Sequence, residues 1–244
     1  MNHRLFAGIV ALSLACAGGA VYAKKTPKEV DDKEKEEATE LVHTVLETLP
    51  SEDTKTRYSS LTDADFKIVA KRLGVEVAAI KAVVEIEAGP KMTGFWAPGV
   101  PVVNFDNSMW NRYVNKCKSK GDKSAKVPSG LKGRHLTAWT RLTNARKTNV
   151  DAANMATFWG MFQIGGFNYA KCGCSSVAEM VRLMCHSELE QLELFASFII
   201  NSGMVNDLKR KNWAAFARKY NGSSYASRGY HTKMAKAYAK FKNQ

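Results

Sequence analysis

From Leu61 onward, apolar residues recur at the spacing of α-helices, and glycines separate the helical stretches. A first helix is expected to begin after Thr62, which is a capping residue, and to end at Gly74. Its apolar face consists of Phe66, Val69, Ala70 and Leu73. Further helices are expected at residues 76–88, 109–113, 135–145, 151–157, 177–184, 187–201, 213–220 and 231–241. This pattern predicts a mainly helical fold.

One segment, residues 93–105, has a different pattern. Glycine and proline alternate there with strand-forming valines and Phe105, which predicts a short β-hairpin or loop. Residues 115–134 are rich in lysine, serine and glycine and are expected to form a long surface excursion. The fold class is therefore mainly α, of the α+β kind, with a small β-hairpin region.

The 244 residues, 45% of them hydrophobic, suffice for one sizeable core.

Residues 1–23 read as a signal peptide, with Arg4, a short apolar run and small residues before Lys24. The alternative is a signal anchor that makes transient membrane contact and is then released, because alanine and glycine hold a helix weakly in lipid. Either implies export to the periplasm or secretion. Residues 24–60 read as a charged tether with a short helix, and residues 61–244 as the folded domain.

Charge is unevenly distributed along the chain. Ten acidic residues lie between Glu29 and Asp53, whereas residues 54–244 contain 30 lysines and arginines against 13 acids, a net charge of +17. Such a field attracts polyanions. Export excludes nucleic acid as the partner, which leaves anionic lipid and the bacterial cell wall, unless the surface is merely basic and soluble.

Removal of residues 1–23 would leave four cysteines in an oxidising compartment. We expect a disulfide between Cys172 and Cys185, which would close a short loop. A zinc site at Cys172, Cys174, Cys185 and His186 is the competing interpretation, but the Cys-x-Cys spacing is unusual for zinc. We expect no metal and no cofactor, since the chain also lacks the glycine loops that bind phosphates.

The helix expected at residues 76–88 carries two nearby carboxylates. At about 100° per residue, Glu87 falls on the same apolar stripe as Ile80 and Val84. Glu85 falls beside Lys81, where an i,i+4 ion pair explains it. A glutamate on a buried stripe must be neutralised, hydrogen-bonded or used, and burial raises its pKa toward the range of a general acid. A structural glutamate that accepts backbone amides remains the alternative.

The chain is expected to have a helix that ends in glutamate, then a small β-region, and then helices that carry the string Trp159-Gly160-Met161-Phe162-Gln163-Ile164. This order resembles the lysozyme superfamily. From Leu61 to the C-terminus, the chain more closely resembles the N-acetylmuramidase family of phage endolysins. The resemblance lies in the order and spacing of these stretches: Leu73-Gly74-Val75, residues 82–87, Trp159 to Tyr169, Met184-Cys185, and Tyr220-Asn221-Gly222 followed by Tyr225, Gly229 and Tyr230. Two departures are visible. Glu87-Ala88 stands where the family has Glu-Ser, and Phe105-Asp106-Asn107-Ser108 where it has Phe-Glu-x-His. The peptidoglycan-binding repeat that often precedes this domain is replaced by the charged tether.

The resemblance implies a lysozyme-like helical domain that cleaves the β-1,4 bond between N-acetylmuramic acid and N-acetylglucosamine in peptidoglycan glycan strands. We expect the protein to be a monomer. It implies Glu87 as the general acid. For the second carboxylate, Asp106 is the first candidate and Glu85 the second. Asp106 could equally be a cap at the end of a strand.

Substrate contacts are expected from Gln163, Tyr169, Tyr220, Asn221 and Tyr225. The tyrosines offer flat faces for sugar rings, and the amides offer donors and acceptors. The alternative for the tyrosines is a core position with a satisfied hydroxyl, and for Asn221 a helix C-terminal turn. Two other functions remain open. A lytic transglycosylase would need only Glu87 and would form 1,6-anhydro ends, and a non-catalytic wall-binding protein would not need the acid.

Overall fold

The computed structural model describes residues 60–244, which belong to one compact unit, Arg57–Gln244. The predicted signal peptide and tether therefore lie outside the described residues, apart from Ser60. In the described part, no helix is long and apolar enough to cross a membrane. This unit is mainly helical, as the sequence predicts, and it contains two small antiparallel sheets.

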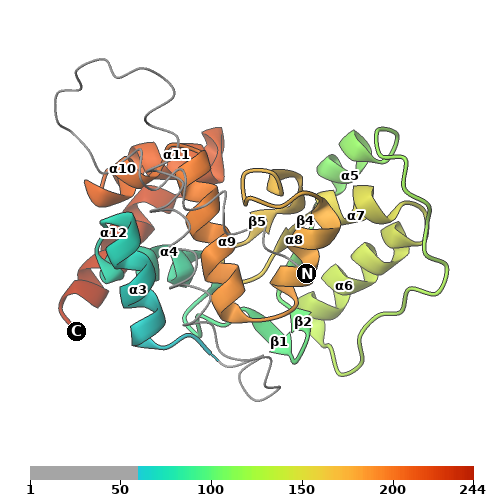
Figure 1. The fold of residues 1–244 in the computed structure, drawn as a ribbon, viewed down its shortest axis with the longest axis horizontal. Helices are drawn as coiled ribbons and strands as arrows, with labels where there is room; N and C mark the ends of the chain where they lie inside the picture. Colours follow the sequence, from blue (N-terminus) through green and yellow to red (C-terminus); the bar gives the residue numbers. More distant parts are fainter. Residues whose placement is uncertain (1–59) are drawn as a thin grey trace, which may run out of the picture. The chain divides into compact units, whose positions relative to one another are not determined.

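The first half of this unit contains α3 (Asp63–Leu73), α4 (Val77–Ala88), β1 (Phe95–Ala97), β2 (Val100–Pro101), β3 (Val103–Phe105), α5 (Asn107–Tyr113), α6 (Gly133–Arg146), α7 (Val150–Met155) and β4 (Thr157–Trp159). The second half contains β5 (Ile164–Gly165), η1 (Gly166–Asn168), α8 (Val177–Met184), α9 (Glu188–Asn201), α10 (Val205–Lys209), α11 (Trp213–Asn221), η2 (Ser223–Tyr225) and α12 (Tyr230–Lys242). Helices α3, α4 and α9–α12 gather on one side of the β4–β5 region, and α5–α7 on the other (Figure 1).

Local sequence explains where several helices begin and end. Thr62 and Asp65 form a reciprocal capping box at the start of α3, and Gly74 ends this helix in the left-handed conformation at φ 63°. The hydroxyls of Ser176 and Ser187 cap α8 and α9 by accepting hydrogen bonds from the Glu179 and Glu190 amides. The predicted apolar face of α3 is the buried one. These boundaries are set by neighbouring residues, which is why they can be read from the sequence.

The β-region is larger than predicted. Strands β1 and β2 form the expected hairpin, but β3 leaves it and pairs antiparallel with β4, which in turn pairs with β5. The segment from Trp159 to Ile164 is therefore a strand, a turn and a second strand, and the prediction that helices carry it is wrong. Likewise, α7 ends at Met155, and Thr157 begins β4 instead of closing the predicted helix.

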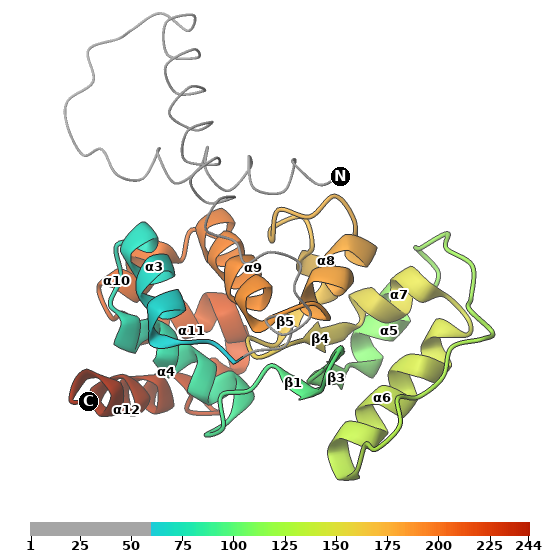
Figure 2. The ribbon, with the colours of Figure 1, turned by 60° about the horizontal axis from the view of Figure 1, so that its bottom comes forward.

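Helix α12 packs along α4, side by side with it (Figure 2). Glu76, just before α4, connects α4 to α12 through hydrogen bonds. Its Oε1 accepts a hydrogen bond from Lys211 Nζ at 2.8 Å, and its Oε2 accepts from the Tyr238 hydroxyl at 2.9 Å and from Lys242. The hydrogen bonds from Lys211 and Lys242 lower the pKa of Glu76 to about 2. The cluster therefore stabilises the fold at any pH above the ordinary range of a glutamate and loses this effect as pH falls toward 2.

Candidate active site

Glu87 lies in the last turn of α4, half-buried beside the apolar residues of that helix. Burial raises the pKa of its carboxyl group from 4.5 to about 7, and a hydrogen bond from Asn221 acts in the opposite direction. The position on the buried stripe agrees with the helical wheel. A carboxyl group with this pKa is protonated in a large fraction of molecules at neutral pH, which a general acid needs.

Two adjacent residues at the end of α11 meet Glu87. Asn221 Nδ2 donates to Glu87 Oε1 at 2.8 Å, while the buried Oδ1 of Asn221 has no hydrogen-bond partner among the described residues. The phenol of Tyr220 is also close, because the charge of Glu87, after burial, contributes to raising the pKa of Tyr220 well above its ordinary value. The ends of α4 and α11 therefore converge on one carboxyl group.

Tyr220 is half-buried and packs against phenylalanines of the core. Its ring stacks on Phe216, with centroids 5.3 Å apart, and contacts Phe195 and Phe198. Its hydroxyl donates to the Phe162 carbonyl at 2.6 Å. This is the core position with a satisfied hydroxyl that the sequence left open as the alternative to a sugar-stacking face. Tyr220 instead connects the Glu87 region to the turn between β4 and β5.

That turn carries Gln163, which adopts a left-handed backbone conformation at φ 46°. A non-glycine residue there is strained, and such strain persists only where the surroundings hold it. The side-chain Nε2 of Gln163 donates to the Gly160 carbonyl at 2.8 Å. Its Oε1 accepts no hydrogen bond from the described residues, so an acceptor remains free near the Glu87 region.

Two buried residues of α9 were not singled out from the sequence: Gln191, which supports this turn, and Glu188, which binds the segments before β1 and α3. Gln191 Oε1 accepts from the Met161 amide at 2.8 Å, and Gln191 Nε2 donates to the Met184 carbonyl at 2.8 Å. Glu188 Oε1 accepts from the Gly94 amide at 2.7 Å, and its Oε2 from the Leu61 amide at 3.0 Å. Gln191 lies one turn before Phe195 on the apolar stripe of α9. The reasoning that found Glu87 would therefore also have found Gln191.

Glu85 and Lys81 do not pair with each other, which corrects the predicted i,i+4 contact. Lys81 Nζ binds Asp63 of α3 at 2.6 Å, and Glu85 binds Lys240 of α12 at 2.7 Å. Both partners come from other helices, so spacing within one helix could not reveal them. Glu85 is thus occupied by a surface ion pair.

Asp106 caps a helix, which is close to the alternative stated for it. Its Oδ1 accepts from the Met109 amide at 2.9 Å and so begins α5. No hydrogen bond or ion pair among the described residues joins Asp106 to Glu87. The second carboxylate oxygen, Oδ2, is not used by the cap.

Tyr169 and Tyr225 are both half-buried. Tyr169 follows η1, after the β5 strand, and its backbone carbonyl accepts from the Cys172 and Cys174 amides. Tyr225 lies in η2, four residues after Asn221, with its ring edge-to-face against His231 at 5.4 Å and the Arg218 guanidinium 5.7 Å away. Of these two tyrosines, Tyr225 is the one closer to Asn221 in the sequence.

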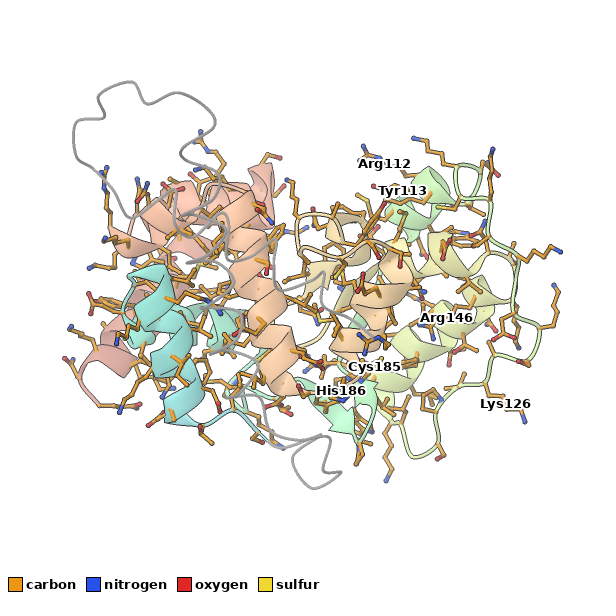
Figure 3. The ribbon with its side chains drawn as sticks, viewed as in Figure 1. Arg112, Tyr113, Lys126, Arg146, Cys185 and His186 are labelled. Atoms are coloured by element: carbon orange, nitrogen blue, oxygen red, sulfur yellow. The ribbon has the colours of Figure 1, made fainter. Side chains whose placement is uncertain are left out.

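All four described cysteines are free thiols, so the predicted Cys172–Cys185 disulfide is not formed. The two side chains meet different groups. Cys185 lies beside Arg146 of α6, as Figure 3 shows, whereas Cys172 is near Cys174 and Tyr220. Burial raises the pKa of Cys185 to about 11 and that of Cys174 to about 12, so both stay protonated thiols. Within residues 60–244, no three histidine, cysteine or acidic side chains cluster as metal ligands would.

Comparisons with known proteins agree with a site that contains a general acid. A family model described as N-acetylmuramidase matches residues 76–242. Among solved structures, the chain is similar to the crystal structure of a Burkholderia AP3 phage endolysin, with a TM-score of 0.62 and 28% sequence identity over 98% of this chain and 94% of that one. No curated protein sequence matches the chain.

Proposed function

Since this chain belongs to the N-acetylmuramidase family and is a peptidoglycan hydrolase of the lysozyme type, we propose that Glu87 is its general acid. We propose further that the bond cleaved is the β-1,4 bond between N-acetylmuramic acid and N-acetylglucosamine. The observation that carries the assignment is the burial of Glu87, which raises its pKa to about 7. At neutral pH the group can therefore give a proton to the glycosidic oxygen and remain as a carboxylate.

The surroundings of Glu87 favour some mechanisms over others. Within the described part of the chain, burial and Asn221 are what shift the pKa of Glu87, and no carboxylate of that part contributes to the shift. A retaining enzyme would hold its nucleophilic carboxylate only about 5 Å from the acid, where its charge would be felt. The environment of Glu87 therefore favours a more distant base that activates water, and Asp106, with Oδ2 unused by the cap, is our candidate. Glu85 is the weaker candidate, since Lys240 occupies it.

The same observation supports a second reaction. Because no carboxylate of residues 60–244 shifts the pKa of Glu87, this residue could also serve alone as acid and then base, which is the requirement of a lytic transglycosylase. We assign hydrolysis as the main function, since the chain belongs to a hydrolase family. The two reactions differ in their products by one molecule of water.

Digestion of purified murein decides between them. We expect mass spectrometry to find reducing N-acetylmuramic acid ends, and NMR of fresh products to show the inverted anomer. The Glu87→Gln variant serves as the control digest. Products with 1,6-anhydro ends would replace hydrolysis by transglycosylation, and the retained anomer would require a carboxylate nucleophile close to Glu87.

For substrate contacts, we propose Gln163, Asn221, Tyr169 and Tyr225. The free acceptors Gln163 Oε1 and Asn221 Oδ1 can receive N–H or O–H groups of the sugars, and the two half-buried tyrosines present ring surface. Tyr220 then acts indirectly, because its ring and hydroxyl are already used.

Asn221 should also set the pH dependence. Its N–H group stabilises the charged form of Glu87, so removing the donor should raise the pKa of Glu87 above about 7. Loss of activity on the alkaline side, where Glu87 gives up its proton, should then move to higher pH. We expect this in the pH–kcat/KM profile of Asn221→Leu, which keeps the side-chain shape and removes the donor.

Asn201→Leu is the matched control, since Asn201 is also the last residue of its helix and donates to a backbone carbonyl, that of Lys171. Its profile should coincide with that of the unmodified enzyme. An unchanged alkaline limb in Asn221→Leu would show that the Asn221–Glu87 hydrogen bond has no role in protonation.

For the organisation of the chain, we propose that residues 1–23 direct export and make transient membrane contact, that residues 24–60 form a tether, and that residues 61–244 act on the wall as a monomer. The support is the amino-acid sequence of these segments. Access to peptidoglycan requires that the domain reach the wall side of the membrane.

A further inference from the structure

Three large hydrophobic side chains are exposed in the described part of the chain, namely Ile68, Trp96 and Leu136, at 61%, 42% and 43%. Trp96 is the aromatic one. Its indole lies against the imidazole of His135 on α6, with ring centroids 4.4 Å apart and planes inclined by 33°. Leu136, the next residue of α6, adds exposed apolar surface. None of these residues is used by the proposed catalytic chemistry.

The hairpin that carries Trp96 is held in place from both strands. On the β2 side, Trp139 Nε1 of α6 donates to the Pro101 carbonyl at 3.1 Å. On the β1 side, the Gly94 amide donates to the buried carboxylate of Glu188 at 2.7 Å. An exposed indole on an anchored hairpin has already lost much of its conformational freedom. Little further conformational entropy is therefore lost when a ligand stacks on it.

Consecutive hydrogen bonds connect this hairpin to the site. The Val102 amide donates to the Gly94 carbonyl at 2.9 Å, and the Gly160 amide donates to the Val102 carbonyl at 2.8 Å. Gly160 is the residue whose carbonyl holds the Gln163 side chain. With strand spacings of about 4.8 Å and a rise of about 3.3 Å per residue, Trp96 lies within about 20 Å of Gly160. That distance corresponds to a few sugar rings of a glycan strand.

We infer that Trp96, backed by His135, forms a sugar subsite that binds the apolar C–H face of an N-acetylhexosamine ring several sugars away from the cleaved bond. This inference rests on the proposed function, since it takes its ligand from the glycan substrate. One side of the indole contacts His135, which leaves ring surface for the pyranose. Burial and the nearby Arg134 lower the pKa of His135, so at neutral pH the imidazole is an uncharged backing for the indole.

The ligand chemistry predicts a specific behaviour. The ring face of N-acetylglucosamine carries no charge, so binding at Trp96 should be insensitive to salt. Attraction of the basic domain to anionic wall polymers should weaken with salt. A soluble oligomer of β-1,4-linked N-acetylglucosamine therefore probes the subsite apart from the charge of the wall.

The experiment uses the full chain with Glu87→Gln as the parent, so that binding is measured without cleavage. We expect Trp96→Ala to weaken binding of the N-acetylglucosamine hexamer about 10-fold by calorimetry, at both low and high salt. Trp96→Phe should recover most of the affinity. Ile68→Ala, which removes the exposed side chain on α3, is the matched control and should bind as the parent does. In the active enzyme, Trp96→Ala should raise KM for murein fragments more than it lowers kcat.

Equal affinity of Trp96→Ala and its parent for the hexamer would overturn the subsite, as would an equal loss in Ile68→Ala. A parent that binds no hexamer would overturn it as well. Failure of the proposed function looks different, because Glu87→Gln would then still cleave murein. That result leaves the comparison between Trp96 variants intact.

Discussion

Replacing Glu87 by glutamine is expected to lower the rate of murein hydrolysis by about 100-fold or more, because general acid catalysis alone contributes at least that factor. The amide is nearly isosteric and can still accept the hydrogen bond from Asn221, so the fold should be retained. It has no acidic proton to give to the leaving oxygen. The measurement is release of reducing ends from purified murein, with circular dichroism to verify folding.

The same substitution should change stability in a pH-dependent way. The pKa of Glu87 is about 7 in the folded chain and near 4.5 in the unfolded one, so the folded state binds the extra proton between these values. Stability of the unmodified enzyme therefore falls as pH rises from 4.5 to 7. The Glu87→Gln variant lacks this loss, and at pH 8 we expect it to melt at a higher temperature than the unmodified enzyme.

Glu85→Gln is the control on the same helix. It removes a partly exposed ion pair with Lys240, which contributes at most about 1 kcal/mol, and it should leave most activity in place. An active Glu87→Gln enzyme, or an inactive Glu85→Gln enzyme with its fold intact, would show that the acid is not Glu87.

The second large effect is expected in stability. Gln191→Leu keeps the volume of a fully buried side chain but leaves the Met161 amide and the Met184 carbonyl without their partners. Each buried polar group left unpaired costs about 1–3 kcal/mol, so the free energy of unfolding should fall by about 2–5 kcal/mol. For a domain of this size, each 1 kcal/mol corresponds to roughly 2–4 °C in Tm.

Ser197→Ala is the matched control for Gln191→Leu. Ser197 is also buried on α9, but its hydroxyl donates only to the Glu193 carbonyl of the same helix. We expect this substitution to lower the free energy of unfolding by about 1 kcal/mol or less. If Gln191→Leu had the same Tm as Ser197→Ala, the Gln191 hydrogen bonds would not hold the β4–β5 turn.

Much of the helical fold could be predicted because its signals are local. Ser187 begins α9 and Gly74 ends α3 through contacts with residues a few positions away. The strands β4 and β5 could not be separated from helix in the same way. They are two or three residues long, and a short apolar run has no periodicity that distinguishes the two.

In the candidate site too, local features could be predicted from the sequence and long-range contacts could not. Glu87 could be found because its neighbours on one helix face are apolar, a pattern contained within a dozen residues. Its partner Asn221 is 134 residues away in sequence, and the actual partners of Glu85 and Lys81 are likewise contributed by other helices. Local sequence therefore indicates which side chain is buried, whereas its neighbours depend on how distant helices meet.

The packing of α12 along α4 has a consequence for how the protein is made. On the ribosome, α4 emerges early, and everything from Gly89 to Gly229 must be synthesised before α12 can cover it. The face of α4 that α12 buries is without its partner in every shorter nascent chain. A chain released prematurely would thus carry Glu87 on an unsupported helix and present apolar surface to chaperones and proteases, so only nearly complete translation yields a working site.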